Sequence, residues 1–224
     1  MRRCVNLILA CAVAIAASLA VSAQAQTLDR LGSLPSARET QRLAPRASAD
    51  AALSAGPAVL APIGWVEFCG HAANAGDCSV DELPGETVRA HARTRRLLAR
   101  INRNVNAAVA PMSDLDNYGV EEVWTYPDAG RGDCEDYVLL KRRLLIEAGL
   151  PRQALLVTVV REANGDGHAV LTVVTDQGDL ILDNKRDDIR LWNATGYDYV
   201  KRQSAESPNQ WVDLRASAAR LARR

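Results

Sequence analysis

The sequence has few aromatic residues and no net charge. One Phe, four Trp and five Tyr stand among 224 residues, so the core must rest mainly on Leu, Val, Ile and Ala. The 27 basic residues balance the 27 acidic ones. A nucleic-acid-binding protein normally shows a basic excess or a basic stripe, so this balance argues against that class. No internal repeat is present, and the length suits one domain with a sizeable core.

Long apolar runs are also absent, except at the N-terminus. Residues 5–21 are almost entirely apolar, follow two arginines and precede an Ala-x-Ala pattern that ends at Ala25. This order is typical of a secretory signal peptide, so we expect residues 1–25 to be removed and the mature protein to be periplasmic. An uncleaved membrane anchor is the alternative, although the run is slightly short for a spanning helix.

Cysteine is scarce, and cleavage after Ala25 leaves only Cys69, Cys78 and Cys134. An odd number of cysteines in an oxidising compartment is consistent with one pair and one free thiol. Cys69 and Cys78 lie nine residues apart across two glycines, a reach that a small loop could close. We therefore expect a Cys69–Cys78 disulfide with Cys134 left free. Two reduced, buried cysteines are the alternative.

The remaining chain divides into a flexible segment and one domain. Residues 26–60 are rich in Ala, Ser, Arg and Pro without a sustained apolar period, which predicts a flexible mature N-terminus. Residues 61–224 form the predicted domain. Apolar spacing predicts helices over 86–110 and from about 132 to 148, with a loop over 112–127 between them. Strands are expected over 154–160, 168–175 and 180–183, separated by Gly- and Asp-rich turns. A helix followed by an antiparallel meander indicates an α+β fold.

Cys134 stands where the second helix is expected to begin. Gly132 and Asp133 precede it, and the apolar helical pattern follows. The positive end of the helix dipole and the free backbone N–H groups favour a thiolate over a thiol. Because the thiolate is the nucleophilic form, this position predicts an activated nucleophile. Taken alone, a cysteine in a helix is more often a small buried residue.

A base and an orienting carboxylate follow on successive predicted strands. His168 opens the strand after the 164–167 turn, and Asp183 ends the next one. Antiparallel pairing can place the two side chains together, so that Asp183 orients the imidazole that serves Cys134. Taken alone, His168 would more often be an ordinary surface residue near a turn, and Asp183 would more often simply end a strand. The combination is more informative than its parts: Cys134 is the expected free thiol at a helix start, and His168 and Asp183 stand on successive strands. Together they favour a Cys-His-Asp hydrolase.

The motifs around these residues resemble the bacterial transglutaminase-like cysteine proteinases. The resemblance rests on Gly-Asp-Cys-Glu-Asp-Tyr over 132–137, Gly-Leu-Pro over 149–151, His-Ala-Val-Leu over 168–171 and Leu-Asp-Asn over 182–184. It covers about residues 62–214. It implies a papain-like or transglutaminase-like fold, in which a helix-borne Cys134 packs on an antiparallel sheet that carries His168 and Asp183. It also implies proteolysis.

The LapG-like members of this family are periplasmic proteases that clip a large cell-surface adhesin and release cells from biofilm. The resemblance therefore implies a protein substrate, and an inner-membrane regulatory receptor is a further possible partner. In these enzymes the acidic residues that flank the nucleophile bind Ca²⁺, which here implies Asp133 and Glu135.

The residue chemistry is compatible with calcium. Carboxylates suit a cation that takes about six to eight oxygen ligands, and Asp114, Asp116 and Asn117 could add to Asp133 and Glu135. The alternative is that Asp133 and Glu135 only stabilise the helix start by their charge. Carboxylates beside a thiolate would raise its pKa, which a bound cation would offset. Zinc is disfavoured because neither His71, which is near Cys69 and Cys78, nor His91 completes a ligand set.

Two functional alternatives and one site feature stay open from the sequence. The same triad could pass its thioester to an amine, as a transglutaminase-type acyl transferase does. The domain could also be a binding module with an inactive triad. The backbone N–H of Cys134 is a natural oxyanion donor, while the region of Trp124 and the Asn106 side chain are both candidates for the second donor.

Overall fold

The computed structural model describes residues 51–78, 86–216 and 219. The predicted signal peptide and most of the predicted flexible segment lie outside these residues. Within the described ranges, no helix combines the length and apolar character that crossing a membrane requires.

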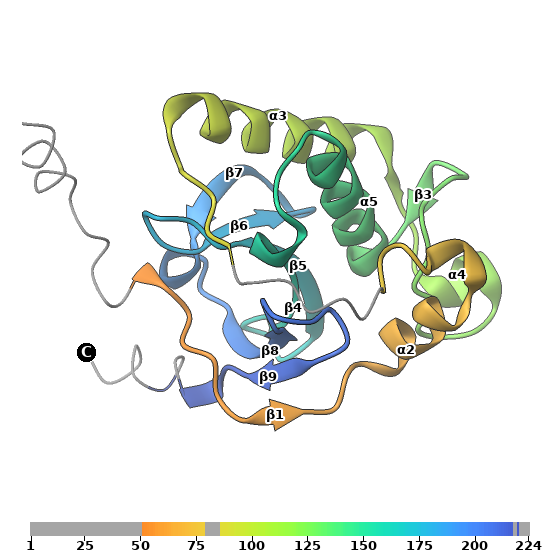
Figure 1. Cartoon of the computed structure of the whole chain (residues 1–224). Helices are drawn as coiled ribbons and strands as arrows, with labels where there is room; N and C mark the ends of the chain where they lie inside the picture. Colours follow the sequence, from red (N-terminus) through yellow and green to blue (C-terminus); the bar gives the residue numbers. More distant parts are fainter. Residues whose placement is uncertain (1–50, 79–85, 217–218, 220–224) are drawn as a thin grey trace, which may run out of the picture. The chain divides into compact units, whose positions relative to one another are not determined.

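A seven-stranded antiparallel sheet forms the centre of the domain (Figure 1). Its strands lie in the order β1-β9-β8-β4-β5-β6-β7. Their bounds are β1 Ala58–Val59, β4 Leu155–Arg161, β5 Gly167–Val173, β6 Leu180–Asp183, β7 Arg186–Leu191, β8 Asp198–Gln203 and β9 Trp211–Asp213. A separate parallel pair joins β2 (Ala110–Pro111) to β3 (Arg131–Gly132), and β3 ends shortly before the helix that starts at Cys134.

Two long helices cover one face of this sheet, as Figure 1 shows. They are α3 (Ala92–Ala108) and α5 (Cys134–Glu147), and α5 packs mainly on β5. The shorter helices are α2 (Ile63–Gly70) and α4 (Asp114–Tyr118). The short 3-10 helices are η2 (Ala72–Asn74), η3 (Arg152–Ala154) and η4 (Trp192–Ala194).

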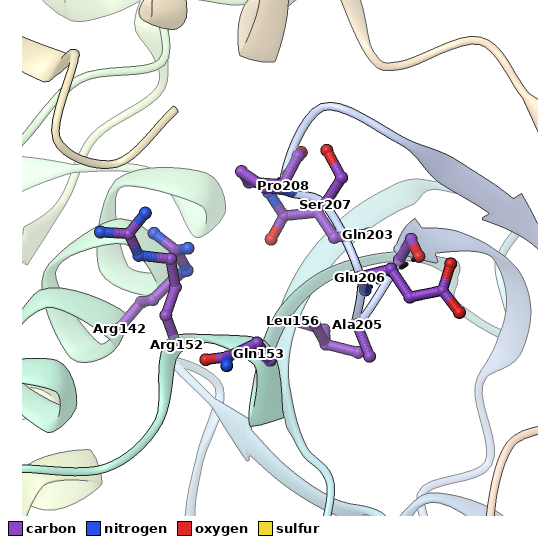
Figure 2. Close-up of a pocket in the computed structure, with 10 residues that line it drawn as sticks. Arg142, Arg152, Gln153, Leu156, Gln203, Ala205, Glu206, Ser207 and Pro208 are labelled. Carbon is purple, nitrogen blue, oxygen red and sulfur yellow. Dashed lines mark hydrogen bonds between the residues drawn. The ribbon is translucent and has the colours of Figure 1, made fainter. Parts of the chain in front are cut away.

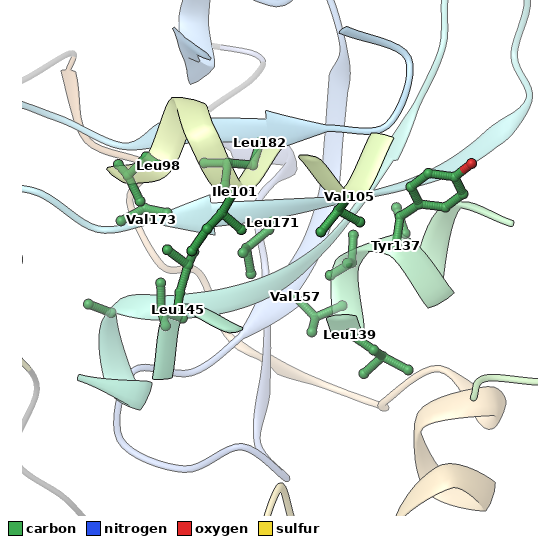
Figure 3. Close-up of a cluster of buried hydrophobic side chains, with 14 of the residues drawn as sticks. Leu98, Ile101, Val105, Tyr137, Leu139, Leu145, Val157, Leu171, Val173 and Leu182 are labelled. Atoms are coloured by element: carbon green, nitrogen blue, oxygen red, sulfur yellow. The ribbon is translucent and has the colours of Figure 1, made fainter. Parts of the chain in front are cut away.

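The main core fills the space between α3, α5 and the sheet (Figure 3). Alternate residues of β5, namely Ala169, Leu171 and Val173, point into it. The intervening Val170 packs on the opposite face with Leu53, Val160, Ile181, Trp192, Tyr199 and Leu214. Both faces of the central strands are thus buried, and each fully buried Leu or Val contributes about 2 kcal/mol.

The predicted α+β arrangement is confirmed, and most predicted elements form within one or two residues of their expected bounds. The exception is the start of the first long helix, which we expected at residue 86. The chain is extended as far as His91, whose ring caps the helix by accepting a hydrogen bond from the backbone N–H of Thr94 (3.1 Å). Val88 instead pairs with Thr175 beside the sheet. Its apolar side chain fits the helical period but is buried through this pairing.

Residues 51–60 differ from the flexible segment that we expected. Ala51 and Leu53 are buried, and β1 pairs with β9, with Val59 opposite Trp211. The backbone of Leu53 donates to the Asp179 carboxylate at 2.9 Å. Residues 51–60 are therefore packed on the domain although they precede the predicted boundary at residue 61, and partners that are distant in the sequence hold them there.

The expected disulfide is present between Cys69 and Cys78, and Cys134 is the free cysteine. The bridge encloses a loop that carries Asp77 next to Cys78. The Asp77 carboxylate accepts bonds from Arg142 on α5 (3.0 Å) and from the Tyr126 hydroxyl (2.7 Å). Because Arg142 is buried, this carboxylate offsets the cost of burying its charge. The bridged loop thus braces the helix that begins at Cys134.

We predict that replacing both bridged cysteines by serine lowers the free energy of unfolding by about 2–3 kcal/mol, the expected loop-closure contribution for a bridge of this span. Urea denaturation of the oxidised protein and of the Cys69→Ser/Cys78→Ser variant measures this difference. Cys134→Ser is the control, since it removes a cysteine without opening a bridge and should cost less. An unchanged unfolding midpoint in the double variant would contradict the stabilising role.

Candidate active site

Cys134 is the first residue of α5, and Asp133 caps that helix without a side-chain capping bond. The chain reaches this point through Gly132, which pairs with Pro111 in the short β2–β3 ladder. A side chain at position 132 would overlap the buried carboxylate of Asp136. Glycine therefore allows β3 to pass close over the first turn of the helix, and this approach fixes where Cys134 starts.

His168 and Asp183 are both buried and in direct contact, as their successive strands suggested. Nε2 of His168 lies 3.0 Å from Oδ1 of Asp183. Burial alone would raise the pKa of Asp183, but hydrogen bonds from His168, Tyr197 and the backbone of Lys185 outweigh it and lower the pKa. An ionised Asp183 accepts the Nε2 proton, which leaves Nδ1 of His168 as the nitrogen available to a nucleophile.

The sulfur of Cys134 lies beside the residue that follows His168. The backbone N–H of Ala169 forms a hydrogen bond to it, and the thiol donates to Oε2 of Glu135 at 3.1 Å. The Ala169 contact arises because α5 packs on β5, whereas Glu135 is the next residue of α5 itself. The structure therefore brings the predicted cysteine close to the strand that carries the predicted base.

The protonation of Cys134 differs from the expectation based on the helix dipole alone. Burial raises the pKa of the thiol well above its ordinary value, and the charge of Glu135 and the bond to its carboxylate raise it further. The Ala169 N–H acts in the opposite direction, but it does not compensate for these effects. Burial, together with the acidic neighbours, thus outweighs the helix start and favours the protonated thiol.

Three carboxylates converge next to this sulfur. Oxygens of Asp114, Asp133 and Glu135 all lie within 4.8 Å of one another. Oδ1 of Asp114 and Oδ1 of Asp133 are buried, with no hydrogen-bond partner among the described residues. Burial raises the pKa of Glu135, and the charge of Asp133 adds to that increase. Burial likewise raises the pKa of Asp114. Such a cluster is costly unless a proton or a cation enters it.

Of the five residues that we considered as calcium ligands, three lie together and two bond to other groups. Asp133 and Glu135 point into the cluster, and Asp114 joins them from α4, where its Oδ2 also accepts the backbone N–H of Val123 (2.5 Å). Asp116 instead bonds Ser113 at the N-terminus of α4, and Asn117 accepts from Arg131. α4 lies inside the segment that we expected to be a loop, and its helical turn directs these neighbouring residues to different sides.

Asp136, in the first turn of α5, connects this helix to the segment at Thr125. It is fully buried, and its Oδ1 accepts the backbone N–H of Thr125 at 2.9 Å. Burial raises the pKa of Asp136 to about 7, and the nearby charges of Asp133 and Asp114 contribute. This contact ties the 123–125 segment to the first turn of α5.

The Trp124 indole and the Asn106 amide, from the two places where we expected a second oxyanion donor, bond to other groups. The Trp124 indole donates to Glu122 at 3.3 Å. The Asn106 amide donates to the backbone carbonyls of Asp183 and Arg186 and to the Asp187 carboxylate. Asn106 thus holds the backbone of Asp183 in place instead of facing the sulfur.

Sequence reasoning missed the role of Tyr197. Its hydroxyl donates to Oδ2 of Asp183 at 2.6 Å, and its ring meets the His168 ring edge-on with centroids 5.5 Å apart. Tyr197 comes fourteen residues after Asp183, with β7 and η4 between them, so no local spacing links the two residues.

A separate cavity lies between the end of α5 and the 203–208 segment, where Arg142 and Arg152 face Gln203 and Pro208 (Figure 2). Its buried polar groups have structural partners. Arg142 bonds Asp77 and the Leu155 carbonyl, and Gln203 bonds the Val157 N–H and the Pro208 carbonyl. None of the residues around Cys134 lines this cavity.

A comparison with protein families decides the identity of this arrangement. The family described as bacterial transglutaminase-like cysteine proteinase (BTLCP) matches residues 55–219. The chain belongs to this family. As a bacterial transglutaminase-like cysteine proteinase, the protein is a cysteine peptidase, and the matched range contains Cys134, His168, Asp183 and the three clustered carboxylates. No curated protein matches the chain.

The proteinase is also similar to solved structures of LapG from Legionella pneumophila. The calcium-bound LapG is 23% identical with a TM-score of 0.47, over 53% of this chain and 68% of that chain. The EGTA-treated LapG is 24% identical with a TM-score of 0.46, over 57% of this chain and 79% of that chain.

We predict that Gly132→Ala lowers the free energy of unfolding by about 1–3 kcal/mol, because the added methyl group must displace Asp136 from its bond to Thr125. Gly167→Ala is the matched control. It flanks His168, but nothing lies within 4 Å of an added Cβ there. Urea unfolding of both variants measures the difference, and equal stabilities would contradict the tight approach at Gly132.

Proposed function

We propose that this proteinase is a periplasmic endopeptidase that uses Cys134 as nucleophile, His168 as base and Asp183 as the residue that orients the base. The observation that carries the proposal is the buried 3.0 Å contact between His168 and Asp183. It commits Nε2 to the carboxylate and leaves Nδ1 for the thiol of the neighbouring helix. This is the division of roles that the triad chemistry requires.

The chemistry follows from these positions. Nδ1 of His168 takes the thiol proton as the sulfur of Cys134 attacks the peptide carbonyl, and the same nitrogen then gives that proton to the leaving amine. The product is a thioester between Cys134 and the acyl half of the substrate. His168 next removes a proton from water, which attacks the thioester and releases the carboxylic acid and the free thiol. Asp183 stabilises the imidazolium in both steps.

The acidic cluster fits a bound Ca²⁺. Asp114, Asp133 and Glu135 offer the hard oxygen ligands that this ion prefers, and the buried oxygens without partners are the ones a cation would satisfy. These three residues would hold the ion. When bound, the ion supplies positive charge that offsets the carboxylates beside the Cys134 sulfur. LapG from Legionella pneumophila has been solved in a calcium-bound form.

The location and the partners rest on the sequence. The signal-peptide pattern over residues 1–25 supports export to the periplasm. The disulfide between Cys69 and Cys78 is compatible with an oxidising compartment. The resemblance to LapG-like enzymes supports a large cell-surface adhesin as substrate and an inner-membrane receptor as regulator. Mapping the new N-termini that the enzyme creates on the surface proteins of its own cells would identify the substrate.

We predict that Cys134→Ala reduces the turnover of p-nitrophenyl acetate to the uncatalysed background, because the nucleophile is lost. Asp183→Asn should lower turnover by about 10²- to 10⁴-fold, since His168 remains but loses its orienting carboxylate. Stopped-flow absorbance separates the acylation burst from steady-state turnover. Native-like turnover by Cys134→Ala would contradict the assignment.

A second experiment separates hydrolysis from acyl transfer. With a peptide substrate and an added amine, an amide product in place of the free acid would indicate acyl transfer.

We predict that Asp114→Asn weakens Ca²⁺ binding by at least about tenfold, because it removes one charged ligand. Titration calorimetry on the chelator-treated protein measures the affinity, and the Ca²⁺-dependent rise in melting temperature provides a second readout. Asp116→Asn is the matched control, because Asp116 lies on the same short helix but points toward Ser113. Absence of Ca²⁺ binding by the native chain, or equal affinities for the two variants, would contradict this site.

A further inference from the structure

We infer that Tyr197 is a positioning residue of the Cys134–His168–Asp183 centre. Its hydroxyl fixes the Asp183 carboxylate, and its ring shields the bond between that carboxylate and His168. The inference rests on the proposed function and adds to it a fourth side chain.

Both oxygens of Asp183 are held by donors. Oδ1 accepts the Nε2 proton of His168 and the backbone N–H of Lys185, each at 3.0 Å. Oδ2 accepts the Tyr197 hydroxyl at 2.6 Å. Without Tyr197, no other described residue is seen to donate to Oδ2, and the carboxylate can rotate about its last bond. With Tyr197 in place, the plane of the carboxylate and therefore the direction of the imidazole are set.

The ring of Tyr197 is placed against His168 as well. The two ring centroids lie 5.5 Å apart at an interplanar angle of 62°. This edge-on contact covers the His168–Asp183 pair, which is itself almost fully buried. A hydrogen bond screened from water in this way is stronger than an exposed one. The tyrosine thus contacts both residues that prepare the base.

The local chain explains how Tyr197 reaches this position. Gly196 precedes it with a φ of +82°, a left-handed conformation that glycine adopts without strain. The Thr195 hydroxyl accepts the Tyr197 backbone N–H at 3.3 Å. This turn between η4 and β8 directs the side chain back over the sheet. Burial and the neighbouring Asp183 carboxylate raise the pKa of Tyr197, so the hydroxyl remains a donor at neutral pH.

The first test compares Tyr197→Phe with Tyr199→Phe. Tyr199 is buried, and its hydroxyl bonds Thr195 and the Trp192 carbonyl and not the triad. Steady-state turnover of p-nitrophenyl acetate depends on His168 activating water at the acetylated Cys134. We expect Tyr197→Phe to lower this turnover about tenfold or more, which is the effect of losing one hydrogen bond to a charged group. Tyr199→Phe should keep native turnover, even if its melting temperature falls.

The second test separates positioning from a general structural role. In an Asp183→Ala background the hydroxyl has no carboxylate to hold, so adding Tyr197→Phe should lower turnover no further. In ¹⁵N-histidine-labelled protein, the downfield Nε2 proton resonance of His168 should shift or broaden in Tyr197→Phe and persist in Tyr199→Phe. Additive losses in the double variant, or an unchanged resonance in Tyr197→Phe, would overturn the inference.

The outcomes also distinguish this inference from the proposed function. If Cys134→Ala turns over the ester like the native enzyme, the triad itself is wrong. If Cys134→Ala is inactive while Tyr197→Phe keeps native turnover, the triad stands and only the role of Tyr197 is refuted.

Discussion

The packing of α5 on β5 is the contact on which the rest of the site depends. Cys134 begins α5, and His168 stands at the start of β5, so the two residues approach only because the helix lies along that strand. The apolar side chains between them, such as Leu139 and Leu171, are fully buried and hold the two elements together. Most of the folding free energy that positions Cys134 beside β5 is therefore hydrophobic, while the polar groups at the end of the interface set the details.

At the N-terminal end of α5, electrostatic effects act on the Cys134 sulfur in opposite directions. The helix start and the Ala169 N–H favour a negative sulfur, whereas burial and the adjacent carboxylates disfavour it. Asp114, Asp133 and Glu135 destabilise one another as well as the thiolate, because like charges in a shielded place repel strongly. One cation would relieve both effects, so the same cluster that keeps the sulfur protonated is the means by which an ion could activate it.

The sequence predicted what local patterns can encode. The helix at Cys134 and the three strands of the meander have clear apolar periods, and the disulfide followed from counting cysteines. Features held by distant partners left no such signal. β1 is a strand only because β9 lies beside it, 152 residues later at Val59 and Trp211. Val88 has a helical spacing but pairs with Thr175. Tyr197 meets Asp183 only after the chain has formed β7 and turned back.

The pairing of Cys69 with Cys78 also has a practical consequence for anyone who handles the enzyme. In a chain that starts after Ala25, every cysteine but Cys134 is consumed by the bridge. A simple colorimetric thiol assay on the denatured, unreduced protein should then report one equivalent per molecule. Any shortfall would count the molecules whose Cys134 thiol has been oxidised, and this count needs no substrate.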